Sequence, residues 1–143
     1  MITAVDSNIL IDVLGADPRF GPGSRSMLRQ SLLEGVVIAC EVVWAEVVAA
    51  FPDVNATESA LTRLSLTFSP LDHHAATRAG IAWRGYRQAG GPRERLVTDF
   101  LVGAHALEQA DRLLTRDRGF HRAAFEGLTI IDPSVTPRVG DAG

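Results

Sequence analysis

The chain has 143 residues, of which 46% are hydrophobic and 22% are charged, and its formal net charge is −3. This length and composition predict one globular domain and exclude a disordered, collagen-like or disulfide-rich chain. The single cysteine, Cys40, cannot form an internal disulfide, and no signal peptide or membrane-spanning stretch is visible, so we expect a cytoplasmic protein. All 14 basic residues are arginines, which excludes enzymes that need a lysine, such as Walker-type nucleotide hydrolases and Schiff-base enzymes.

The hydrophobic pattern predicts short strands that alternate with longer helices. In chain order the predicted elements are a strand at 2–5, a helix at 9–14 with a Ser or Asn cap, a loop at 17–23, a helix at 24–34, a strand at 36–39, a buried helix at 42–51, an amphipathic helix at 57–66, a short strand at 67–71, helices at 73–89 and 97–110, and strands at 112–115 and 128–131. This alternation predicts an α/β fold in which a short parallel sheet is covered by helices on both faces. We expect one domain over residues 1–132 and a flexible carboxyl-terminal tail over 133–143.

Four acidic residues lie where a carboxylate is unusual. Asp6 and Asp117 follow predicted strands, and ligands bind at the carboxyl ends of the strands in sheets of this kind. Glu46 lies within the apolar run at 42–51, and Asp99 opens another apolar helix. Because a buried carboxylate is costly unless it is paired or binds a metal, these positions point to a functional site.

Each acid also has a plain structural explanation when it is taken alone. Asp6 could form a turn, and Glu46 could face solvent or pair with an arginine. Asp117 could pair with Arg116, and Asp99 could complement the positive end of its helix. Four carboxylates that converge repel one another, however, and a hard divalent cation with oxygen ligands, Mg²⁺ or Mn²⁺, would relieve that repulsion.

The histidines and small residues are interpreted as structural. His105 lies six residues after Asp99, about 240° around the helix, so it is expected to point away from that acid. Gly103 shares the helix face of Asp99, which is expected to let the start of this helix lie close against other backbone. We interpret all four histidines as structural or surface residues: His73, His74, His105 and His121.

Four segments in a fixed order carry a family resemblance: residues 5–12 (VDSNILID), 44–47 (WAEV), 98–106 (TDFLVGAHA) and 114–120 (LTRDRGF). With these segments the chain resembles the PIN-domain family, and more narrowly the VapC ribonuclease toxins of bacterial toxin–antitoxin pairs. The resemblance extends over about residues 2–132 and depends on the whole set rather than on any single segment. One departure is Thr98, where many members carry Pro or an apolar residue; a Thr there can cap the helix and leave Asp99 in the first turn.

The resemblance implies a catalytic site that also binds Mg²⁺ or Mn²⁺, made of four acids: Asp6, Glu46, Asp99 and Asp117. Of these, Asp6 and Asp99 are the first choice as direct metal ligands. Two supporting polar residues are implied beside them, Asn8 and Thr115. The implied activity is endonucleolytic hydrolysis of RNA by metal-activated water. Two arginines that flank Asp117 are expected to contact RNA phosphates: Arg116 and Arg118.

The resemblance also implies partners: a VapB-like antitoxin, an RNA substrate and a second copy of the chain in a homodimer, with no membrane. Two alternatives remain open. One is a PIN-domain nuclease of RNA processing that is not a toxin, and the other is a catalytically silent module that binds RNA or protein. The complete set of four acids argues against the silent module, and the absence of an additional domain favours the toxin.

Overall fold

The computed structural model describes residues 1–91 and 97–133. Within these ranges, five parallel strands form one sheet in the order β3-β2-β1-β4-β5. The strands are β1 (Ile2–Val5), β2 (Val36–Ala39), β3 (Thr67–Phe68), β4 (Arg112–Leu114) and β5 (Ile130–Ile131). The first strand of the chain is therefore the central strand of the sheet.

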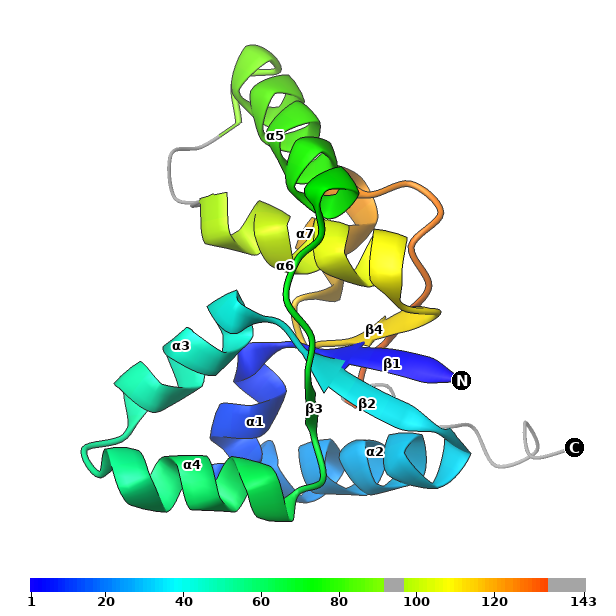
Figure 1. Cartoon of the computed structure of the whole chain (residues 1–143). Coiled ribbons are helices and arrows are strands. Elements are labelled where there is room, and N and C mark those ends of the chain that lie inside the picture. Colours follow the sequence, from blue (N-terminus) through cyan, green and yellow to red (C-terminus); the bar gives the residue numbers. More distant parts are fainter. Residues whose placement is uncertain (92–96, 134–143) are drawn as a thin grey trace, which may run out of the picture.

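The described residues form seven helices: α1 (Ser7–Leu14), α2 (Gly21–Glu34), α3 (Glu41–Ala50), α4 (Val54–Arg63), α5 (His73–Gln88), α6 (Val97–Gln109) and α7 (Arg118–Ala124). On one face of the sheet, α6 packs against β1 and β4, and α5 packs on the outside of α6; on the other face, α2 packs against β2 and α1 packs against α2. Figure 1 shows the sheet between these two groups of helices. The predicted α/β fold, with a parallel sheet covered on both faces, is confirmed.

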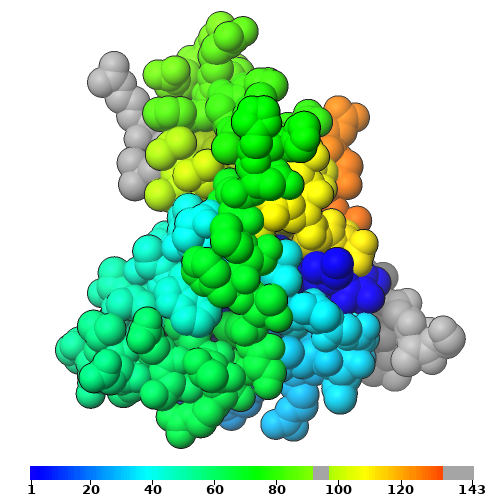
Figure 2. Space-filling model, in the orientation of Figure 1, coloured from blue at the N-terminus to red at the C-terminus, as the bar shows by residue number. Residues whose placement is uncertain are grey.

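The strands are apolar because the helices cover both faces of the sheet. On the three central strands, Val5, Val37 and Leu113 are almost completely buried, and each contributes about 1.5–3 kcal/mol through removal from water. The edge strand β3 is different, because its segment runs over the surface from the end of α4 to the start of α5 (Figures 1 and 2). Phe68 of this strand is exposed.

A second, smaller hydrophobic cluster joins α5, α6 and α7. Its buried members are Ala79, Phe100, Ala104 and Phe125. The ring of Phe100 makes edge contacts with Phe120 and Phe125 of the α7 region. This cluster fixes the position of α7, which follows β4 and carries residues close to the end of that strand.

Several element boundaries differ from the predictions for local reasons. Helix α1 begins at Ser7, because Asp6 is its cap and accepts the Ser7 N–H at 2.7 Å, so the predicted Ser or Asn cap is wrong. Helix α2 begins at Gly21 inside the predicted loop, since Pro22 is tolerated in a first turn. Thr98 lies inside α6 rather than at its cap, and Asp99 is in the first turn as expected.

Other predictions were incomplete or lie beyond what the structure describes. Helix α7 was not predicted at all. The predicted tail, residues 133–143, lies outside the described residues except for Pro133. Among the helices of the described ranges, none has the length and apolar character that a membrane crossing requires.

Candidate active site

The ends of β1 and β4 bring two of the predicted acids together. Val5 pairs with Leu114 in the sheet, so Asp6 and Thr115 follow neighbouring strands at the same edge. The Thr115 hydroxyl donates to Asp6 Oδ2 at 2.8 Å and accepts the Asp117 N–H at 2.9 Å. Thr115 thus bridges the Asp6 carboxylate and the Asp117 N–H.

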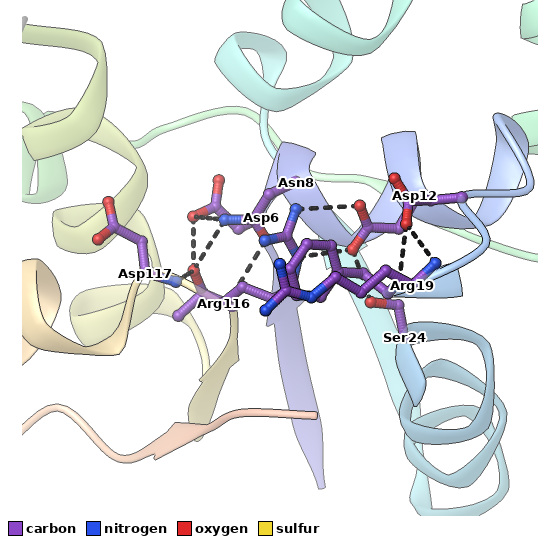
Figure 3. Close-up of polar contacts among 10 residues, drawn as sticks. Asp6, Asn8, Asp12, Arg19, Ser24, Arg116 and Asp117 are labelled. Carbon is purple, nitrogen blue, oxygen red and sulfur yellow. Dashed lines mark hydrogen bonds and ion pairs between the residues drawn. The ribbon is translucent and has the colours of Figure 1, made fainter. Parts of the chain in front are cut away.

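The side chain of Asn8 completes this polar cluster. Its Nδ2 lies 3.3 Å from Thr115 Oγ1 and 3.5 Å from Asp6 Oδ2, and its Oδ1 accepts the Arg116 N–H at 3.2 Å (Figure 3). Asn8 therefore ties the start of α1 to the chain that leaves β4. The structure places both of the supporting residues predicted from the sequence, Asn8 and Thr115, in direct contact with Asp6.

Asp6 is 8% exposed, yet it remains well stabilised as a carboxylate. Burial by itself raises the pKa of Asp6. Hydrogen bonds from His121, Thr115 and the Ser7 N–H, together with the electrostatic attraction of the nearby His121 ring, outweigh this burial and hold the pKa of Asp6 below its ordinary value. Asp6 is therefore a negatively charged group, fixed in position, at the carboxyl edge of the sheet.

Glu46 reaches the same edge from α3, by a different route from the one predicted. Helix α3 buries only Val43 and Val47 among its residues, and Glu46 is exposed, so the prediction that Glu46 lies in a buried helix is wrong. The Ser7 hydroxyl lies 3.4 Å from Glu46 Oε1 and links Glu46 to the start of α1.

Two acids at this edge act electrostatically on a third. Although Glu46 is exposed as a whole residue, its carboxylate is partly removed from water, and this desolvation is the first cause that raises its pKa; the negative charges of Asp6 and Asp99 raise it further, while the Ser7 hydrogen bond opposes the shift. Asp99 lies in the first turn of α6, the helix that packs against β1. Asp6 and Asp99 therefore both affect the Glu46 carboxylate, although the three residues are far apart in the sequence.

We refer to the four acids Asp6, Glu46, Asp99 and Asp117 as the acid site. Within residues 1–91 and 97–133, no three His, Cys, Asp or Glu side chains are arranged as a ready-made metal site. The chemistry of the acid site still fits a hard divalent cation, because its donors are carboxylate oxygens whose mutual repulsion raises the pKa of Glu46. Asp6, Glu46 and Asp99 are the acids for which this repulsion is seen.

The predicted RNA-contacting arginines occupy different surroundings. Arg116 forms a two-pronged ion pair with Asp12 (Figure 3), with Nε 2.6 Å from Oδ2 and Nη2 3.0 Å from Oδ1. Its guanidinium carbon also lies over the Phe20 ring, 4.0 Å from the centroid. The pairing of Arg116 with Asp117, considered from the sequence, is therefore replaced by pairing with Asp12. Arg118 is the first residue of α7 and is half-buried.

One residue of the site was missed by the sequence analysis. His121 is 2% exposed, and its Nε2 lies 3.4 Å from Asp6 Oδ2. The available signal was its spacing: His121 lies four residues after Asp117, on the same face if the segment is helical. The interpretation of His105 is confirmed, because its buried ring contacts the Ser69 hydroxyl at 3.3 Å, away from the acids.

Comparison with known proteins identifies the family. The model of the PIN domain matches residues 3–126, so the chain belongs to the PIN-domain family. These proteins are nucleases, and they generally use divalent metal ions. No sequence among the curated proteins matched the chain.

The fold is shared with solved toxin–antitoxin complexes. VapBC2 from Rickettsia felis, bound to a DNA fragment from its promoter, matches with 20% identity and a TM-score of 0.72 over 92% of this chain and 98% of that chain. VapBC-1 from nontypeable Haemophilus influenzae matches with 16% identity and a TM-score of 0.73 over 94% and 100%. FitAcB from Neisseria gonorrhoeae matches with 21% identity and a TM-score of 0.68 over 95% and 100%.

Proposed function

We propose that the protein is a metal-dependent endoribonuclease and the toxin of a toxin–antitoxin pair. The observation that carries this proposal is the placement of Asp6 and Glu46 on the same Ser7 hydroxyl at the carboxyl edge of the sheet, with the charge of Asp99 also acting on Glu46. Membership of the PIN-domain family supports nuclease chemistry. The structural likeness to VapBC and FitAcB complexes supports the role as a toxin with an antitoxin partner.

In this proposal the acids hold one or two Mg²⁺ or Mn²⁺ ions, with Asp6 and Asp99 as direct ligands. A bound ion supplies a water of lowered pKa and stabilises charge on the phosphoryl oxygens. Glu46 and Asp117 orient the attacking water or hold a second ion. Thr115 and Asn8 keep the Asp6 carboxylate in place through the hydrogen bonds described above. The products would be a 5′-phosphate and a 3′-hydroxyl.

RNA is a polyanion and must approach a protein whose net charge is negative. The four acids of the acid site account for that negative net charge. With the four site acids set aside, the formal net charge of −3 becomes slightly positive. Arg118 stands at the start of α7 next to Asp117 and is the better placed of the two predicted RNA contacts, because Arg116 already binds Asp12. We further propose a VapB-like antitoxin, a homodimer and a cytoplasmic location, in which the buried thiol of Cys40 stays reduced.

Cleavage of RNA by the purified chain tests the enzymatic part. We expect cleavage with Mg²⁺ or Mn²⁺, none with EDTA, and none from Asp6→Asn or Asp99→Asn proteins that keep a native circular dichroism spectrum. Asp111→Asn is a matched control. Asp111 directly precedes β4, at the amino ends of the strands and therefore away from the acid site, where it accepts the Ile2 N–H at 2.6 Å. Undiminished cleavage by the Asp6→Asn protein would contradict the proposed site.

The toxin role has a separate test. Expression of the chain alone should arrest bacterial growth, and expression of the Asp6→Asn variant should not. Sequencing the RNA ends that the purified protein produces would define the substrate. Harmless overproduction of folded, active nuclease would favour the RNA-processing alternative instead.

A further inference from the structure

His121 is placed against the acid site by a helix that the sequence pattern did not reveal. It lies on α7, four residues after Asp117, and both residues approach Asp6: Asp117 through Thr115, and His121 directly, with Nε2 3.4 Å from Asp6 Oδ2. The imidazole is 2% exposed. Helix α7 thus contributes two residues around the same carboxylate.

The two ring nitrogens of His121 have unequal surroundings. Within the described part of the chain, Nδ1 is buried and has no hydrogen-bond partner. It lies close to Gly103, and the ring of Phe120 packs edge-on against the imidazole. A buried donor without an acceptor is costly, so the proton belongs on Nε2, where the Asp6 carboxylate accepts it.

Packing alone does not explain a histidine at this position. An apolar side chain would fill the space between Phe120 and Gly103 without leaving a buried nitrogen unpaired. The unpaired Nδ1 is a cost, and the interaction that offsets it is the contact of Nε2 with Asp6. The same contact favours the ionised form of Asp6 and lowers its pKa. His121 therefore acts on the Asp6 carboxylate.

We propose that His121 is a positioning residue, whose Nε2–H holds the Asp6 carboxylate in the orientation that binds the divalent cation. This inference rests on the proposed function, in which Asp6 is a metal ligand. Hydrogen bonds that orient metal ligands commonly change metal affinity by 10–100-fold when they are removed. His121 would set metal affinity in this way without touching either the ion or the RNA.

Mn²⁺ binding to the full-length protein, measured by calorimetry, tests the proposal. His121→Met keeps an apolar side chain of similar size and removes the donor, and we expect Mn²⁺ to bind about 10–100-fold more weakly. His121→Gln places an amide N–H near the position of Nε2 and should restore affinity to within about threefold of the wild type. The matched control is His105→Met, since His105 is equally buried but contacts Ser69, and its affinity should be unchanged.

A second measurement needs no variant and so does not depend on folding of the mutants. Nitrogen-15 NMR of the imidazoles should show the His121 proton on Nε2, and added Mg²⁺ should shift the His121 signals but not those of His105. A proton on Nδ1 would overturn the proposal, because Nε2 could then not donate to Asp6.

The outcomes separate this inference from the proposed function. Affinity of the His121→Met protein within about twofold of the wild type, with binding abolished by Asp6→Asn, overturns the role of His121 and leaves the metal site intact. Wild-type protein that binds no Mn²⁺ overturns both. Equal weakening in the His121→Met and His121→Gln proteins would show that the shape of the ring matters and its donor does not, which also overturns the proposal.

Discussion

At the scale of single residues, Asp6 has two roles at once. Its carboxylate caps α1 by accepting the Ser7 N–H, and it is the acid around which the polar side chains of Thr115, Asn8 and His121 gather. These contacts keep Asp6 ionised in a buried position. The electrostatic consequence is felt by Glu46, which lies in the negative field of Asp6 and Asp99.

The first prediction concerns the pKa of Glu46 in the metal-free protein. Carbon-13 NMR should show Glu46 titrating above the ordinary glutamate range, and Asp6→Asn or Asp99→Asn should lower its pKa, because each removes one of the repelling charges. The Asp111→Asn control should leave the pKa of Glu46 where it is. A Glu46 pKa that does not respond to Asp6→Asn would mean that the carboxylates do not converge.

This raised pKa also fixes the sign of a stability effect. The ionised form of Glu46 is disfavoured in the folded protein and therefore lowers the free energy of unfolding. This loss of stability is present above the pKa of Glu46 in the folded protein and disappears as the pH falls through that value. In EDTA, Glu46→Gln should therefore raise the Tm at neutral pH, and the gain should shrink as the pH falls through the Glu46 pKa. The effect of Asp6 on stability has the opposite sign. Its ionised form stabilises the folded protein, and this stabilisation is lost as the pH falls through the lowered pKa of Asp6.

A second prediction separates the two arginines that flank Asp117. Arg116→Ala leaves the buried Asp12 without its ion-pair partner and should lower the free energy of unfolding by about 2–4 kcal/mol. Arg118→Ala should change it by less than about 0.5 kcal/mol. Urea denaturation measures both values.

If Arg118 contacts RNA, its alanine variant should cleave RNA more slowly, with a smaller salt dependence of binding. Equal losses of stability for the two variants would be inconsistent with the ion pair between Arg116 and Asp12. Unchanged cleavage by the Arg118→Ala protein would remove Arg118 from the proposed RNA contacts.

At the scale of elements, the position of α7 depends on Gly103 of α6. A Cβ at this position would lie 2.3 Å from Phe125 Cε2 and 2.9 Å from His121 Nδ1. Gly103 is thus closely packed, but against side chains of the α7 region, so the predicted approach to other backbone is wrong. Helix α7 can carry Asp117 and His121 to the acid site because Gly103 leaves room for their helix.

The third prediction uses this contact. Gly103→Ala should destabilise the protein by about 1–3 kcal/mol, because Phe125 and His121 must both move, and it should weaken RNA cleavage. Gly80→Ala is a matched control on α5: a Cβ there meets no atom within 4 Å, so it should stabilise the protein by about 0.5–1 kcal/mol. Thermal unfolding followed by circular dichroism compares the two. Equal effects would show that Gly103 does not hold α7 in place.

The elements that the sequence predicted well have strong local patterns. The apolar runs of β1 and β2 and the long periodic segment of α5 lie close to their expected bounds. Helix α7 was missed because it has only seven residues, and most of its stability comes from contacts of Phe120 and Phe125 with a helix that is distant in the sequence. Such contacts leave no local pattern in a short segment.

The candidate site was predictable where it depends on strand ends. Asp6, Thr115 and Asp117 follow parallel strands, and the topology alone brings such residues to one edge. Glu46 was selected because its apolar neighbours suggested burial, yet α3 packs through Val43 and Val47 and leaves Glu46 exposed. The contact of His121 was not predictable, since it required both the existence and the orientation of α7.

At the scale of the whole molecule, the proposed metal binding at the acid site would couple to the stability of the fold. The fourth prediction is that Mn²⁺ raises the Tm, with a stabilisation of about 2.7 kcal/mol when free Mn²⁺ reaches 100 times its Kd. The effect should weaken at acidic pH, because protonation of Glu46 removes a ligand charge. Differential scanning calorimetry of the wild type and the Asp6→Asn protein measures it; an equal Mn²⁺ effect in both would place the ion elsewhere.

The pairing of β1 with β4 has a consequence for synthesis of the protein on the ribosome. β1 is synthesised well before β4, which ends at Leu114, and the hydroxyl that anchors Asp6 belongs to the next residue, Thr115. A nascent chain whose synthesis has reached only residue 100 holds three of the four acids and has no β4 to gather them. The acid site therefore stays incomplete until Thr115 and Asp117 have left the ribosome.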